Sequence, residues 1–213
     1  MTSERGLRLQ VVLAARRLSA MGLNPGRSGN LSARVDDGFL VTPSGAAYDT
    51  LHPDDLVFLG RLGEHGGGQR EPSSEWRLHR DVYAERAEAA AIVHTHSPYA
   101  TTLACLGRGI PSFHYEVAFA GGNDIRCAPY ATFGTQELSD HTSAALEGRR
   151  ACLLANHGAV VLGESVEDAL GLAEKVEALA RLYWQVLQVG EPVLLDEVEM
   201  KHVVEKFKGY GRR

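Results

Sequence analysis

Short apolar runs alternate with longer stretches whose apolar residues recur at helical spacing, and this alternation restricts the chain to a mixed α and β fold. The short runs predict β-strands at residues 31–35, 39–42, 56–59, 89–94, 151–155 and 159–162. Helical spacing predicts one helix from a cap at Ser3 to Gly22, and others at residues 76–86, 98–106, 135–146, 165–189 and 195–207. No repeat, low-complexity segment or linker divides the chain, so we expect residues 1–213 to form one domain.

Local turn and cap signals support several of these boundaries. The tripeptide Asp36-Asp37-Gly38 joins the first two strands and predicts a β-hairpin. Pro98 stands in the first turn of its helix, where the missing N–H costs no hydrogen bond. Ser165, with Asp168 three residues later, resembles a capping box and predicts the start of the longest helix.

Composition and charge narrow the classes of function. Hydrophobic residues make up 44% of the chain and charged residues 23%, which is typical of a soluble globular protein. The net charge is −5 and no Lys/Arg cluster exceeds a pair, which argues against nucleic acid or an anionic membrane as a partner. No secretory signal is visible in residues 1–10, no apolar stretch approaches the ~18 residues of a membrane span, and the three cysteines lie far apart. We therefore expect reduced thiols and a cytoplasmic location.

Three histidines lie where predicted strands end. His94 and His96 are two residues apart, so in a strand their side chains point to one face. An isolated pair of this kind more often hydrogen-bonds carbonyl groups, but His157 stands at a second strand end, followed by a glycine that permits a tight turn. Three imidazoles on rigid strand ends can bind one divalent metal and leave a coordination position open, as in catalytic sites. We interpret the other six histidines as surface or core residues.

A second group of polar residues precedes the helix at 76–86. Ser73 and Ser74 bring two hydroxyls and backbone N–H groups to a helix N-terminus, where a phosphate can bind. Glu75 follows at once in the same turn. The simpler interpretation is an ordinary serine cap with a glutamate that the helix dipole favours, and alone it is the stronger one.

Two further turns could complete an anion site. One contains Gly29-Asn30 and the other Ser44-Gly45, and small residues let backbone N–H groups approach an oxyanion closely. Each is also an everyday turn signal. The Gly-x-x-x-x-Gly-Lys and Gly-x-Gly-x-x-Gly patterns are absent, which disfavours nucleotide and dinucleotide binding.

The ordered set of these motifs resembles the class II aldolase/adducin-head family, and most closely its L-fuculose-1-phosphate aldolase branch. The resemblance extends beyond the candidate site and covers nearly the whole chain. The segments that carry it are Gly29-Asn30, residues 42–45, 72–76, 94–96 and 156–158, His114-Tyr115, and residues 120–123, 127–135 and 205–211.

The resemblance implies a three-layer α/β/α domain with a mostly antiparallel central sheet, assembled as a homotetramer with active sites between subunits. It implies Zn²⁺ as cofactor, held by residues at the positions of His94, His96, His157 and Glu75, the last of which also carries a proton during turnover. It implies that Tyr115, from a neighbouring subunit, and Tyr210, near the C-terminus, complete the catalytic site. The positions implied to bind the substrate phosphate are Asn30, Ser44, Gly45, Ser73 and Ser74.

The activity implied is reversible cleavage of a ketose 1-phosphate, of the L-fuculose 1-phosphate type, to dihydroxyacetone phosphate and an aldehyde. We expect mainly neutral groups to bind the phosphate, because these turns contain no Arg or Lys. A 5-deoxyribulose or methylthioribulose 1-phosphate aldolase would use the same residues. A pentulose-phosphate 4-epimerase fits less well, because that branch follows its serine pair with Asp and Thr. A non-enzymatic adducin-head-like module would lack the histidine set. The chain departs from this branch at Asn156, because the branch has a histidine at this position, just before the third metal ligand.

Overall fold

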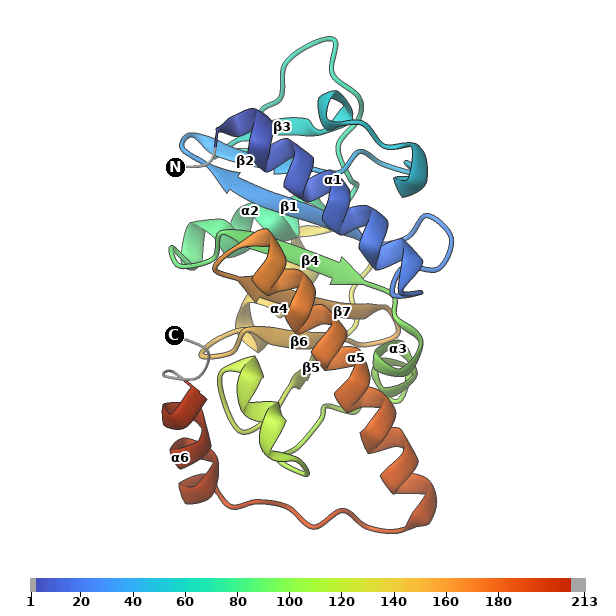
Figure 1. Ribbon diagram of the computed structural model, residues 1–213, viewed down its shortest axis with the longest axis vertical. Coiled ribbons are helices and arrows are strands. Elements are labelled where there is room, and N and C mark those ends of the chain that lie inside the picture. Colours follow the sequence, from blue (N-terminus) through green and yellow to red (C-terminus); the bar gives the residue numbers. More distant parts are fainter. Residues whose placement is uncertain (1–2, 208–213) are drawn as a thin grey trace.

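Seven strands form one sheet in the spatial order β3-β2-β1-β4-β7-β6-β5, as Figure 1 shows. The computed structural model describes residues 3–207. Neighbouring strands are antiparallel except β5 and β6, which run parallel. The strands are β1 (Asn30–Val35), β2 (Gly38–Val41), β3 (Val57–Gly60), β4 (Ala91–Thr95), β5 (Arg126–Ala128), β6 (Ala151–Leu154) and β7 (Gly158–Gly163).

Helices cover both faces of this sheet (Figure 1). Apolar residues of α1 (Glu4–Ala20), α3 (Pro98–Cys105) and α5 (Val166–Val189) form one buried cluster, and those of α2 (Trp76–Glu85) and α4 (Gln136–Ala145) belong to a second. The helix α6 (Glu197–Phe207) packs beside the first cluster. The predicted three-layer α/β/α domain with a mostly antiparallel sheet is confirmed.

The strand sequences explain why both faces need cover. In β4, Ala91 and Val93 belong to the cluster under α1 and α5, whereas Ile92 belongs to the cluster under α2 and α4. In β7, Val161 belongs to the cluster under α1 and α5, and Val160 belongs to the cluster under α2 and α4. A strand that is apolar on both sides is stable only in the interior of a layered domain, and β4 is the central strand of this sheet, with β7 beside it.

The predicted helices and strands are confirmed to within a few residues at each end. Ser3 caps α1 by accepting a hydrogen bond from the Gly6 N–H at 3.2 Å. Ser165 caps α5 in the same way, but Asp168 accepts from the Glu164 N–H and not from that of Ser165, so the capping box is only half formed.

The sequence did not predict β5 or three short 3₁₀ helices, η1 (Tyr48–Thr50), η2 (Pro53–Asp55) and η3 (Tyr115–Ala120). All four are too short to develop a period that a sequence pattern could reveal. Strand β5 forms only because β6 offers it a parallel partner far along the chain.

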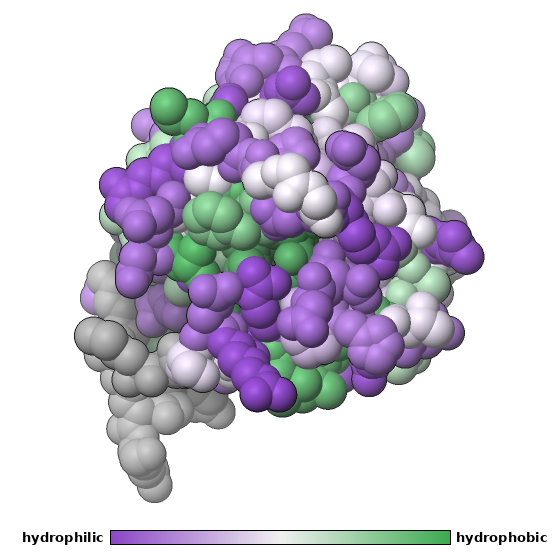
Figure 2. Space-filling view, turned by 90° about the horizontal axis from the view of Figure 1, so that it is seen from above, coloured by the Kyte–Doolittle hydropathy of each residue, from purple (hydrophilic) through white to green (hydrophobic). Residues whose placement is uncertain are grey.

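The outer surface is mainly polar, as expected for a chain in which 23% of the residues are charged. Figure 2 shows one end of the molecule covered mainly by hydrophilic side chains, with apolar side chains visible in a small hollow near its centre. Among residues 3–207, no helix combines the length and the apolar character needed to cross a bilayer.

The antiparallel register brings distant segments to one edge of the sheet. Asn30, the first residue of β1, pairs with His94 near the end of β4. Thr95 pairs with Ala159 at the start of β7, so the turn that carries His157 lies beside the end of β4. The N-terminus of α2 reaches the same place, where Asn30 contacts Glu75.

Candidate metal centre

The three histidines converge at this edge of the sheet. The ring centroids of His94, His96 and His157 are 4.8 Å apart in each pair. With Glu75, they offer four ligand atoms that all lie within 4.8 Å of one another. The structure therefore places together the four residues that the sequence resemblance assigned to a metal.

The strand ends fix the orientation of these rings. His94 is fully buried, and its Nδ1–H donates to the Ala159 carbonyl at 3.0 Å, which turns Nε2 toward the other histidines. His157 lies in the tight turn between β6 and β7, where Asn156 has a positive φ of 56°. The turn fits closely against β4, because a Cβ at Gly158 would lie 2.2 Å from the Thr95 carbonyl oxygen.

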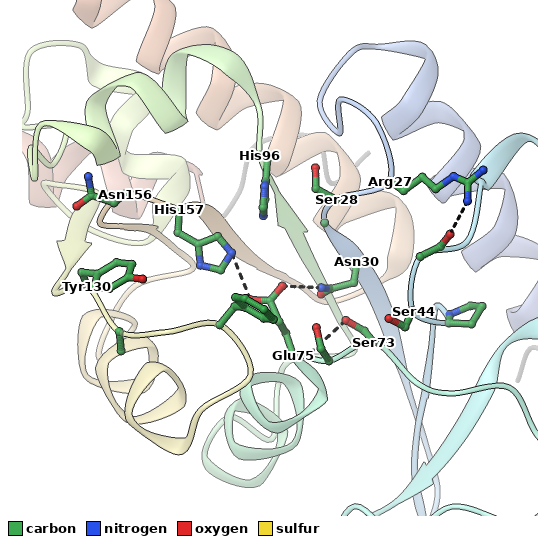
Figure 3. Close-up of a pocket in the computed structure, with 16 residues that line it drawn as sticks. Arg27, Ser28, Asn30, Ser44, Ser73, Glu75, His96, Tyr130, Asn156 and His157 are labelled. Atoms are coloured by element: carbon green, nitrogen blue, oxygen red, sulfur yellow. Dashed lines mark hydrogen bonds and ion pairs between the residues drawn. The ribbon is translucent and has the colours of Figure 1, made fainter.

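Glu75 directly precedes the first residue of α2, and Figure 3 shows it in the cavity wall. Its side chain is buried, with 7% of its surface exposed. Its Oε2 lies 3.1 Å from His94 Nε2 and accepts from Asn30 Nδ2 at 3.0 Å. Its Oε1 lies 3.3 Å from His157 Nε2 but has no hydrogen-bond partner. Burial opposes ionisation, but His94, His157 and the Asn30 amide outweigh it and lower the pKa of Glu75.

The imidazoles differ in their affinity for protons. Burial, together with the nearby His94, lowers the pKa of both His96 and His157 to about 4, so their rings are neutral at pH 7. Burial also acts against a charged His94, but the Glu75 carboxylate outweighs it and raises the pKa of His94. The cluster thus presents two neutral imidazoles, the His94 ring and the Glu75 carboxylate, and a cation bound there would take the place of the proton that Glu75 favours on His94.

This donor set fits a divalent metal. The Nε2 atoms of His94 and His96 are 2.9 Å apart, and two lone pairs at that distance require a proton or a cation between them. The buried Glu75 Oε1 has no hydrogen-bond partner, so it too requires a proton donor or a cation nearby. Three imidazoles with a carboxylate are ligands that zinc and other transition metals accept.

A cavity of about 320 Å³ opens beside the cluster, and Figure 3 shows its lining. Glu75, His96 and His157 form one part of the wall. The rest includes all five residues expected to bind phosphate, which are Asn30, Ser44, Gly45, Ser73 and Ser74. Metal donors and candidate phosphate donors therefore share one chamber.

Sequence reasoning missed several residues of this wall, of which Arg27 is the most consequential. It is the only Arg or Lys among the described residues that line the cavity, and its guanidinium donates to the Gly45 carbonyl at 3.4 Å. The cavity wall therefore includes one cationic side chain beside the neutral groups expected to bind the phosphate. The available signal was its place in the glycine-rich turn just before Gly29-Asn30. The other lining residues missed are Ser28, Tyr130 and Ala131.

Tyr115, one of the two expected tyrosines, does not line the cavity of its own chain. Tyr115 begins η3, is half exposed, and stacks on Phe207 with ring centroids 6.1 Å apart. It is not among the residues that line the cavity. Tyr210 lies outside the described residues.

Comparison with known proteins gives a consistent result. The sequence model of the class II aldolase and adducin N-terminal domain matches residues 9–184. The chain is 55% identical over 209 residues to the 5-methylthioribulose-1-phosphate/5-deoxyribulose-1-phosphate aldolase of Rhodospirillum rubrum, covering 98% of this chain and 94% of that protein. It is 46% identical over 205 residues to the L-fuculose phosphate aldolase of Escherichia coli, covering 96% and 95%.

A solved structure of L-fuculose 1-phosphate aldolase superposes with a TM-score of 0.92 at 39% identity, over 95% of this chain and 96% of that one. Fold and sequence therefore agree along almost the full length. The protein belongs to the class II aldolase and adducin N-terminal domain family and is a class II aldolase of the fuculose-phosphate/ribulose-phosphate type.

Proposed function

We propose that this enzyme reversibly cleaves a ketose 1-phosphate to dihydroxyacetone phosphate and an aldehyde, with zinc held by His94, His96, His157 and Glu75. The observation that carries the proposal is the shared cavity, in which a buried metal-donor cluster faces a wall of hydroxyl, amide and backbone donors. A metal bound there would act as a Lewis acid on the substrate carbonyl at C2.

The phosphate group would bind at the part of the cavity wall that the metal donors do not form. Asn30, Ser44, Gly45, Ser73 and Ser74 are all uncharged and line that wall. Arg27 adds one cationic group at the exposed side of the cavity, where its guanidinium can exchange the long contact with Gly45 for a phosphate oxygen. We infer that neutral donors set the position of the phosphate and that Arg27 adds attraction.

Two groups would move protons during cleavage. The C4 hydroxyl gives up its proton as the C3–C4 bond breaks, and C3 takes up a proton afterwards. We assign the second transfer to Glu75, whose buried carboxylate borders the cavity. We assign the first to Tyr115 of a neighbouring subunit, in a homotetramer with sites between subunits, because Tyr115 is half exposed and lies outside the cavity of its own chain. Tyr210 stays a proposed third catalytic residue.

The aldehyde half distinguishes the candidate substrates. Tyr130 and Phe133 are exposed aromatic residues on the cavity wall and suit a short apolar end. The Rhodospirillum rubrum relative favours 5-methylthioribulose 1-phosphate or 5-deoxyribulose 1-phosphate, and the Escherichia coli relative favours L-fuculose 1-phosphate. We propose the first pair as the leading candidates, because the identity is higher, and L-fuculose 1-phosphate as the second. The cytoplasmic location inferred from three unpaired cysteines stays a prediction.

One experiment tests these points together. The purified protein is analysed for metal and then assayed for release of dihydroxyacetone phosphate from the three ketose 1-phosphates, with ribulose 5-phosphate as a control for epimerase activity. We expect about one zinc per chain, cleavage that a chelator abolishes and zinc restores, and no epimerisation. Chelator-insensitive cleavage would contradict the metal assignment, and epimerisation without cleavage would contradict the proposed reaction.

A further inference from the structure

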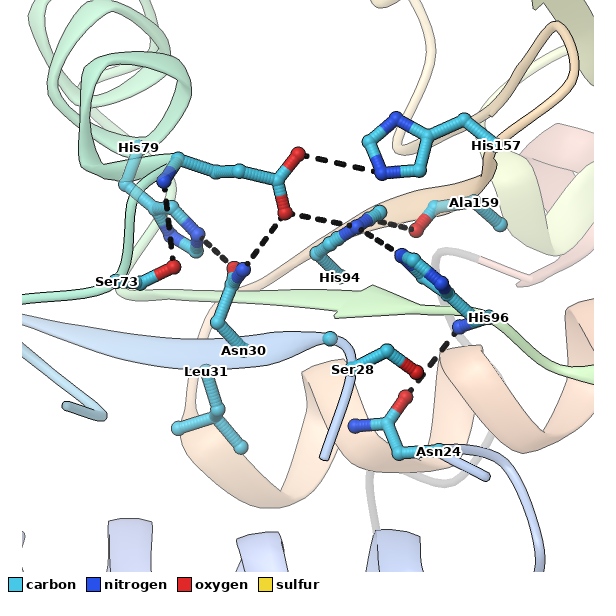
Figure 4. A network of polar contacts seen from close by, with 12 residues as sticks. Asn24, Ser28, Asn30, Leu31, Ser73, His79, His94, His96, His157 and Ala159 are labelled. Carbon is cyan, nitrogen blue, oxygen red and sulfur yellow. Dashed lines mark hydrogen bonds and ion pairs between the residues drawn. The ribbon is translucent and has the colours of Figure 1, made fainter. Parts of the chain in front are cut away.

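A line of buried hydrogen bonds runs from Glu75 away from the cavity and into the core beneath α2, and Figure 4 shows its link between Asn30 and His79. Asn30 Nδ2 lies 3.0 Å from Glu75 Oε2, and Asn30 Oδ1 lies 2.5 Å from His79 Nε2. His79 Nδ1 is 2.6 Å from Ser32 Oγ, which is 2.8 Å from Tyr83 Oη. We call the four residues Tyr83, Ser32, His79 and Asn30 the donor chain. All of them are buried, and Ser32 and His79 completely so.

Chemistry allows only one direction for these hydrogen bonds. Glu75 is a carboxylate and can only accept, so Asn30 must direct its NH₂ group toward it and its carbonyl oxygen toward His79. His79 must then donate from Nε2, and because burial lowers its pKa to about 3 it is neutral, with a lone pair on Nδ1. Ser32 must donate to that lone pair, which leaves its oxygen to accept the Tyr83 hydroxyl proton. Every member donates toward Glu75.

We propose that the donor chain is a positioning device: His79, held as the Nε2–H tautomer by Ser32 and Tyr83, locks the Asn30 amide so that its NH₂ group always faces the metal and phosphate site. Without the His79 donor, the amide could rotate and present its carbonyl oxygen to a carboxylate. That orientation would repel Glu75 and a bound phosphate alike.

The donor chain gives a role to His79, which the sequence analysis left among the six histidines interpreted as surface or core residues. His79 lies one helical turn after Glu75 on α2, so the same helix supplies the metal-site carboxylate and the group that orients its neighbour. Strand β1 supplies Ser32 and Asn30 on one face, two residues apart. The buried hydroxyl, imidazole and amide groups thereby satisfy one another in an apolar interior.

The tautomer of His79 can be measured directly in the wild-type holoenzyme. Nitrogen-15 labelling of histidine distinguishes a protonated from an unprotonated ring nitrogen in NMR spectra, and His79→Gln identifies the signal. We expect a neutral ring with a proton on Nε2, unchanged between pH 6 and 8. A proton on Nδ1, or a cationic ring, would overturn the proposal without reference to any enzymatic assay.

A matched pair of variants tests the function of the donor. In His79→Gln the side-chain NH₂ can take the place of Nε2–H, whereas in His79→Asn it is too short to reach Asn30. Zinc affinity is measured by competition with a chromophoric chelator. We expect His79→Asn to lose on the order of tenfold to a hundredfold in zinc affinity and His79→Gln to stay close to wild type. Equal losses in both would show that only packing matters and would overturn the proposal.

The assignment of Asn30 to the phosphate rests on the proposed function and is tested separately. Inorganic phosphate is titrated into the zinc-loaded variants by calorimetry. Weaker phosphate binding in His79→Asn than in His79→Gln supports both the donor chain and the phosphate site. If only the zinc affinity differs, the donor chain stands and the phosphate assignment fails. If either variant is too unstable to purify, Ser32→Ala replaces the pair, and a zinc affinity equal to that of wild type would overturn the proposal.

Discussion

Gly158→Ala adds one methyl group beside the metal centre and tests how tightly the geometry of the centre is set. Gly158 does not have a positive φ, so alanine can adopt its backbone conformation and only the available space matters. The new Cβ would lie 2.2 Å from the Thr95 carbonyl oxygen and 3.2 Å from His96 Cδ2. It would therefore push the turn that carries His157 away from the strand end that carries His96.

The size of the displacement follows from these distances. Ordinary contacts of a Cβ atom begin at about 3.4 Å, so β7 and β4 must separate by roughly 1 Å at this point. Metal–ligand distances tolerate only about 0.2 Å, so His157 can no longer share a metal with His94 and His96. A misplacement of this size is expected to cost about a hundredfold in turnover, and overpacking about 1–3 kcal/mol of unfolding free energy.

Gly163→Ala is the matched control. Gly163 ends the same strand, and its Cβ would lie 2.3 Å from the Ala169 backbone nitrogen, far along β7 from His157. We expect both variants to be destabilised in urea denaturation, but only Gly158→Ala to lose zinc in a chelator titration and turnover at saturating zinc. If Gly158→Ala keeps wild-type zinc affinity, or if Gly163→Ala loses as much, the reasoning from strand separation is refuted.

Four further predictions follow from the same geometry. Glu75→Gln should keep zinc on the three imidazoles and lower turnover by about 10²–10⁴-fold, and wild-type turnover would contradict its role as a proton carrier. Tyr115→Phe should slow cleavage more than exchange of the C3 proton of dihydroxyacetone phosphate; equal slowing of both would argue against the assignment. Arg27→Met should raise KM about twofold to fivefold with little change in kcat, and the difference should shrink at high salt; a change in kcat alone would exclude a role in phosphate binding. In the metal-free protein, we expect the unfolding free energy of wild type to fall faster than that of His79→Gln as pH drops from 6.5 to 4, by about 1.4 kcal/mol per pH unit. The reason is that His79 takes up a proton in the unfolded chain, whereas the buried ring, with a pKa of about 3, stays neutral. Urea midpoints at a series of pH values measure this, and parallel pH profiles would contradict it.

Much of the site was predictable because its signals are local. His94 and His96 fall on one face of a strand whatever the rest of the chain does, since side chains alternate along a strand. The serine pair before α2 marks a helix start for equally local reasons. The resemblance to a family then joined these separate signals into one site, which spacing alone left open.

The roles of Arg27 and His79 were not predictable in this way. An arginine in a glycine-rich turn has no periodicity, and only the fold decides whether it faces solvent or a cavity. His79 occupies a core position on α2, and its partners Asn30 and Ser32 are brought to it by the docking of α2 on β1. Such contacts depend on side-chain direction at a packed interface, which the sequence pattern does not specify.

The sequence by itself determined the alternating helices and strands, the layered α/β class and the residue types able to bind a metal, because hydrophobic period and turn chemistry act over a few neighbouring residues. The tertiary structure alone decided that His94, His157 and Glu75 meet. That meeting depends on the antiparallel register of β1, β4 and β7 and on α2 lying against them. Register is set by the burial of whole strand faces between helix layers, so it belongs to the folded domain and to no single segment.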